Sequence, residues 1–105
     1  MRTVDLKRSC PPDVQGETVA WLTRHLEARL RDFGPGGPEV LETDQAHGTV
    51  TARFPGHDTE TVLNKLEQQC GISAELENDH ARFHLSPQIP FEDLDYVWGC
   101  LFALL

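Results

Sequence analysis

Positive charge is scarce in this 105-residue sequence, which has nine lysines and arginines against seventeen aspartates and glutamates. The net charge of −8 is spread along the chain and disfavours nucleic acid as a partner, because phosphates attract cations. The one basic group, Arg2, Lys7 and Arg8, lies beside Asp5 and is too small to anchor the chain to an anionic membrane. We therefore predict neither nucleic acid nor membrane as a partner.

Long apolar runs and cysteines are also lacking. No segment approaches the roughly 20 apolar residues of a membrane helix, and the first residues lack the apolar core of a secretory signal, so we expect a cytoplasmic protein. Cys10, Cys70 and Cys100 are too widely spaced for a disulfide framework or a zinc site. Reduced thiols, no metal and one compact domain are the expectation.

The sequence does contain regular apolar spacing. Residues 1–12 are predicted to be an extended or loose segment with a short edge strand at residues 3–6, and residues 13–105 a single domain. The first predicted helix ends at the Gly/Pro run 34–38. Its apolar stripe is Val19, Leu22, Leu26, Leu30 and Phe33.

Two hairpins and two more helices follow in the pattern. Strands are predicted at 39–43 and 49–54, and again at 72–77 and 81–86. A helix capped by Asp58 and ended by Gly71 lies between the hairpins, and a last helix runs from Pro90 to the end. The order (β)αββαββα predicts an α+β two-layer sandwich with a ferredoxin-like rhythm, in which three helices cover one face of a four-stranded, or with the first segment five-stranded, antiparallel sheet.

From about Val19 onward the chain resembles the C-terminal small domain of fold-type I pyridoxal-phosphate enzymes, especially class V aminotransferases and cysteine desulfurases. The stretches that carry the likeness are RLRDFG at 29–34, GTVTARFPG at 48–56, the helix 58–72, HLSP at 84–87 and FEDLD at 91–95. The resemblance implies the small-domain scaffold, here standing alone. It also implies that pyridoxal phosphate would be bound only if another chain supplied the large domain.

The sequence departs from that family where its chemistry resides. The large domain of the family supplies a Schiff-base lysine, whereas this chain has only Lys7 and Lys65. His84 stands where the family commonly has a carboxylate-binding arginine, two positions before Ser86, and imidazole lacks the guanidinium fork. No loop with the desulfurase cysteine is recognisable. We therefore assign no catalytic, cofactor-binding or metal-binding residue and expect the isolated chain not to be an enzyme.

The histidines offer little chemistry of their own. His80 and His84 share a strand face but lie about 13 Å apart, too far to hold one metal ion. His84 is better placed to pair with Glu75 or Glu77 across the hairpin. His25, on the first helix, and His47 and His57, in turns, are expected to be solvated.

Two surfaces remain as candidates for binding. The uncovered sheet face would offer Arg53 and Arg82 as anchors for an acidic group, although a merely solvated sheet face is the competing interpretation. The last predicted helix, which we call the closing helix, is apolar on nearly all its sides. This pattern favours self-association through Trp98, Leu101, Phe102 and Leu105. Alternatively, Trp98 or Phe102 would fold back on the first helix within a monomer.

The leading functional hypothesis is a non-catalytic domain that binds itself or another protein. One alternative is a fragment or subunit of a pyridoxal-phosphate enzyme that needs a large domain in trans. Another is a small acidic chaperone-like binding module, which fits the size and charge without a supporting motif.

Overall fold

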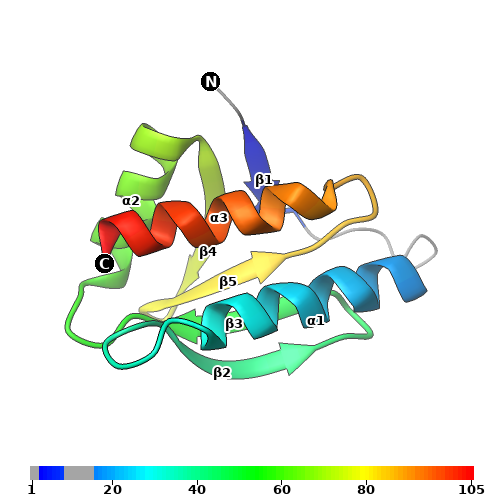
Figure 1. Ribbon diagram of the computed structural model, residues 1–105, viewed down its shortest axis with the longest axis horizontal. Coiled ribbons are helices and arrows are strands. Elements are labelled where there is room, and N and C mark those ends of the chain that lie inside the picture. Colours follow the sequence, from blue (N-terminus) through cyan, green and yellow to red (C-terminus); the bar gives the residue numbers. More distant parts are fainter. Residues whose placement is uncertain (1–2, 9–15) are drawn as a thin grey trace.

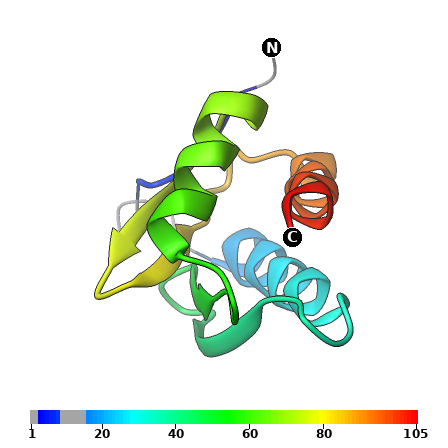
Figure 2. The ribbon, with the colours of Figure 1, turned by 90° about the vertical axis from the view of Figure 1, so that its left-hand side faces the viewer.

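The computed structural model describes residues 3–8 and 16–105, and its elements follow the predicted order. They are β1 (Val4–Leu6), α1 (Glu17–Arg31), β2 (Glu39–Asp44), β3 (Thr49–Arg53), α2 (Thr59–Lys65) with its extension η2 (Leu66–Cys70), β4 (Ile72–Glu77), β5 (His80–His84) and α3 (Phe91–Leu104). The helices cover one face of the sheet (Figures 1 and 2), which confirms the α+β fold. Residues 9–15, where the predicted domain boundary falls, lie outside the described part.

The five strands form one mixed sheet in the order β1-β4-β5-β3-β2. Three pairs are antiparallel as predicted, but β1 runs parallel to β4, with Val4 opposite Ile72 and Leu6 opposite Ala74. The prediction of an entirely antiparallel sheet was therefore wrong at this edge. Three alternating residues indicate which side chains point inward, but they carry no signal for strand direction.

Four of the five residues of the predicted apolar stripe are buried on α1, whereas the fifth, Phe33, lies beyond the end of the helix and is half-buried. The side chains of Val19, Leu22, Leu26 and Leu30 face the sheet. Thr23 is also buried, and its hydroxyl group is satisfied because it donates a hydrogen bond to the Val19 carbonyl at 2.7 Å. The described helix begins at Glu17, and arginines occupy its last turn, where the helix dipole favours cations. The chain then turns at Gly34, which has a φ of 78°.

The second helix begins and ends at the predicted residues. The Asp58 side chain accepts a hydrogen bond from the Thr61 amide, and Gly71 ends the helix in the left-handed conformation. Its last five residues, Leu66–Cys70, adopt π-helical hydrogen bonding, which the sequence does not predict. Over a single turn, the spacing of apolar residues does not distinguish a π from an α conformation.

Both hairpins form, and each has a distinguishing feature. Asn78 and Asp79 join β4 to β5 with positive φ angles of 51° and 66°, as a two-residue turn of this kind requires. The pairing of β2 with β3 is interrupted by a bulge between Val40 and Glu42, and the residue at the bulge, Leu41, is exposed. The strand β2 is the outer strand on this side of the sheet.

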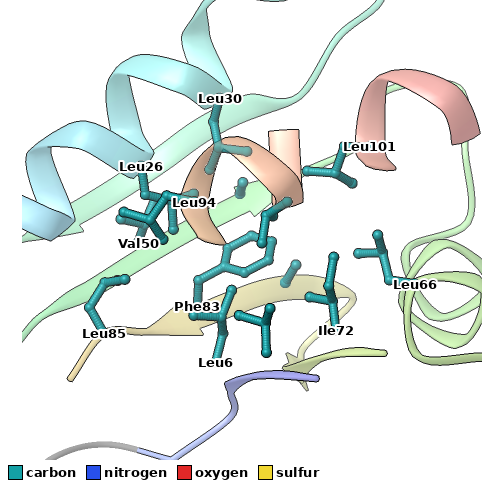
Figure 3. Close-up of a cluster of buried hydrophobic side chains, with 14 of the residues drawn as sticks. Leu6, Leu26, Leu30, Val50, Leu66, Ile72, Phe83, Leu85, Leu94 and Leu101 are labelled. Carbon is teal, nitrogen blue, oxygen red and sulfur yellow. The ribbon is translucent and has the colours of Figure 1, made fainter. Parts of the chain in front are cut away.

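The core lies between the sheet and the helices and is centred on Phe83 (Figure 3). The side chain of Phe83 projects from β5, and α3 places Leu94 and Leu101 over it. Other residues around it come from every layer: Leu6, Leu26, Leu30, Val50, Leu66, Ile72 and Leu85. In the described part of the chain, no helix has the length and apolar character needed to cross a membrane.

Candidate functional site

The residues considered for pyridoxal chemistry do not come together. Lys65 is exposed at the end of α2, and Lys7 is exposed just after β1. His84 is only 9% exposed, and its Nε2 lies 3.1 Å from a carboxylate oxygen of Glu75. The predicted His84–Glu75 pairing is therefore confirmed, and Nε2 of His84 already faces a carboxylate of the chain itself. Across residues 3–8 and 16–105, no group of three or more His, Cys, Asp or Glu side chains could hold a metal ion.

The uncovered sheet face satisfies its charges internally. Arg53 pairs with Glu39 on the neighbouring strand at 2.8 Å, and Arg82 pairs with Glu77 at 2.8 Å. Each arginine therefore already faces a carboxylate of an adjacent strand, and His84 faces Glu75 in the same way. An acidic ligand would have to displace an existing partner of either arginine, so this face is a weak anion site.

A row of aromatic side chains lies instead between α1 and α3, which run side by side in the same direction (Figure 1). Near the start of both helices Trp21 stacks on Phe91, with ring centroids 4.6 Å apart, and the His25 ring lies 4.0 Å from Phe91. Near their ends Trp98 and Phe102 stack on each other at 5.4 Å, and both rings lie within 6.0 Å of Phe33. We call Trp21, Phe33, Phe91, Trp98 and Phe102 the α1–α3 face.

Asp95 joins the two helices in the middle of this face. One of its carboxylate oxygens lies 2.9 Å from His25 Nε2 and accepts a hydrogen bond from Arg29 Nε at 2.8 Å. The guanidinium of Arg29 also lies 5.8 Å from the centre of the Trp98 ring. The hydrogen bond with His25, and then that with Arg29, lowers the pKa of Asp95 below its usual value. His25 was predicted to be solvated; its side chain is only 18% exposed because α3 packs against it, so that prediction was wrong.

The Asp95 cluster predicts a specific loss of stability in acid. Because the pKa of Asp95 is lower in the folded chain, its contribution is complete above the usual value of 3.8 and is lost as the pH falls below it. We expect Asp95→Asn to lower the free energy of unfolding by about 1 kcal/mol at neutral pH, a modest value because the side chain is 43% exposed. The deficit should shrink towards pH 2 in urea unfolding curves. Glu67→Gln, at an exposed helix position, is the control. A deficit independent of pH would contradict this assignment.

Much of the α1–α3 face is open to solvent. Phe102 is 60% exposed and Trp21 49%, and they are two of the four large apolar side chains that are exposed in the described chain. Of the four residues predicted for self-association, Leu101 is buried in the core, while Trp98 and Leu105 are half-buried and Phe102 is exposed. Trp98 does pack towards the end of the first helix through Phe33, as the alternative prediction held.

Trp21 and Phe91 were not predicted to take part. Trp21 lies off the apolar stripe of its helix, so the sequence alone places a large aromatic side chain on the solvent side of α1. That placement is the signal that could have identified it. His25 and Arg29 are four residues apart and therefore lie on the same side of α1. Two donors in this position can share one acceptor on a neighbouring helix, as they do with Asp95.

Comparison with known proteins finds no matching family model and no matching curated protein. Among solved structures, the chain is similar to a NifS-like protein, with a TM-score of 0.68 and 17% sequence identity over 83% of this chain. The match covers 27% of that protein, so this chain spans about a quarter of its length. At this identity the likeness concerns the fold. The chain therefore shares its fold with part of a NifS-like protein.

Proposed function

We propose that this chain is a non-catalytic domain, resembling a detached aminotransferase small domain, that acts by binding a second copy of itself through the α1–α3 face. The observation that carries the proposal is the exposure of Phe102, which lies stacked on Trp98 at the surface of the closing helix. Aromatic side chains held by neighbouring rings are rigid and lose little entropy on binding, so they are effective contacts in interfaces.

The distribution of charge favours a second copy as the occupant. The helix α1 carries three arginines and two glutamates, whereas α3 carries three acidic residues and neither lysine nor arginine. Arg24 is exposed on α1 without an ion-pair partner in the described chain, and Glu92 is exposed in the first turn of α3. A two-fold axis through the face would set each α1 against the acidic helix of the partner, which gives a closed and self-complementary contact.

The test is the molar mass in solution, measured by light scattering and sedimentation equilibrium at high micromolar concentration. We expect the wild type to have twice the mass of one chain, and Phe102→Ser or Trp21→Ser to weaken the association about 30-fold, as loss of an interface aromatic usually does. Leu76→Ser is the matched control, since Leu76 is exposed on β4 away from this face. A monomeric wild type, or equal weakening by Leu76→Ser, would refute the proposal.

A second candidate rests on the structural match. Because the chain spans about a quarter of the NifS-like protein, it would serve as one piece of a pyridoxal-phosphate enzyme whose large domain comes from another chain. The exposure of Lys7 and Lys65 weighs against cofactor binding by this chain alone. Co-purification with a separately encoded large domain, in a complex that binds pyridoxal phosphate stoichiometrically and keeps a visible absorbance band on dialysis, would favour this candidate over the first.

A further inference from the structure

Two cysteine thiols meet where the closing helix passes the end of the second helix. Cys70 is the last residue of η2, and Cys100 lies in the third turn of α3. The Cys100 thiol is close enough to Cys70 to help raise its pKa. Both side chains are half-buried and pack against the edge of the core, and neither is in a disulfide. Thirty positions in sequence separate two sulfurs that are neighbours in space.

A separate contact fixes this arrangement. The Tyr96 hydroxyl donates to the Cys70 carbonyl oxygen at 2.7 Å. Tyr96 and Cys100 are four residues apart on α3 and therefore share one face of that helix. One face of α3 thus packs against the end of η2, which brings the backbone that carries Cys100 next to the backbone that carries Cys70.

We infer that Cys70 and Cys100 form a dithiol that closes reversibly to a disulfide, a modification site that links α3 to η2. With oxidised glutathione as the oxidant, one protein thiolate attacks the glutathione disulfide, forms a mixed disulfide and releases one glutathione. The other cysteine then attacks the mixed disulfide, which forms the Cys70–Cys100 bond and releases a second glutathione. Two protein thiols are oxidised, one glutathione disulfide is reduced, and the two thiol protons pass to the released glutathiones.

The environment of the pair sets the speed of this exchange. Burial, together with the neighbouring Cys100 thiol, raises the pKa of the Cys70 thiol to about 11. Only a thiolate attacks a disulfide, so Cys70 reacts little at neutral pH. We therefore expect the bond to form slowly near pH 7 and faster in alkaline solution.

The experiment exposes the fully reduced, folded protein to excess oxidised glutathione in mildly alkaline buffer. We expect peptide mapping by mass spectrometry to identify a Cys70–Cys100 link, with the loss of two hydrogens from the joined peptides, that dithiothreitol reverses. The oxidised chain should unfold about 10 °C higher than the reduced chain, because a closed loop of about 30 residues restricts the unfolded state.

The other cysteine supplies the control. Cys10→Ser should form the link as the wild type does, whereas the double variants Cys10→Ser/Cys70→Ser and Cys10→Ser/Cys100→Ser should each retain one glutathione as a stable mixed disulfide on the remaining cysteine. Circular dichroism of each variant checks that it is folded. The proposal is overturned if the wild type keeps its free thiols, retains glutathione on Cys70 or Cys100, or forms only links that involve Cys10. These measurements follow bonds within one chain, so they do not depend on self-association.

Discussion

Phe83→Ala is expected to lower the free energy of unfolding by about 3–5 kcal/mol, a large part of the stability of a domain this size. Phe83 has no exposed surface, and side chains from the sheet and from α3 surround it (Figure 3). Alanine would remove these contacts and leave a cavity that the closely packed neighbours fill only in part. Urea unfolding followed by circular dichroism measures the loss.

Phe102→Ala makes the same chemical change at an exposed position and serves as the control. Under dilute conditions, where any association is absent, we expect it to cost less than about 1 kcal/mol, since surface changes have small effects. Equal losses for the two variants would contradict the position of β5 at the centre of the core.

Gly48→Ala is expected to cost about 2–4 kcal/mol for two combined reasons. Gly48 has a φ of 70°, a conformation that side chains disfavour. A Cβ atom there would lie 2.5 Å from Val19 Cγ1 and 3.1 Å from the Leu85 carbonyl oxygen. The Gly48 carbonyl also accepts a hydrogen bond from the Leu85 amide at 2.7 Å, so the backbone has little freedom to move away.

Gly34→Ala separates the two contributions. Gly34 has a similar φ of 78°, but a Cβ atom there would meet nothing within 4 Å. We expect it to cost about 1 kcal/mol, the conformational part alone. The difference in stability between the two variants, measured from their melting temperatures, gives the free-energy cost of crowding the contact between the β2–β3 hairpin and α1. If both variants lose the same stability, that contact is unimportant.

The sequence predicted those features that depend on neighbours along the chain. Asp58 caps α2 and Gly71 ends η2 because both effects arise within one turn of a helix. The stripe Val19, Leu22, Leu26 and Leu30 is buried because a helix presents every third or fourth residue to the same side. The order of elements follows from these local signals.

The features that the sequence did not reveal depend on long-range packing. Which strand β1 joins is decided by residues nearly seventy positions away, and its direction leaves no mark on Val4 or Leu6. The pairing of His25 with Asp95 and the meeting of two thiols arise only when α3 docks against the other helices. The candidate site lies mostly on this docked helix, which is why fewer of its residues were predicted.

The bulge in β2 has a consequence for how copies of this protein can assemble. A straight outer strand offers free amide and carbonyl groups that can template endless sheet growth between molecules. Here Leu41 interrupts the ladder, and Glu42 adds a negative charge that the same edge of a second copy would repel. The outer strand on the opposite side of the sheet, β1, is only three residues long. Both borders thus resist fibril-like stacking, and the finite assembly that we propose would form on the helical side instead.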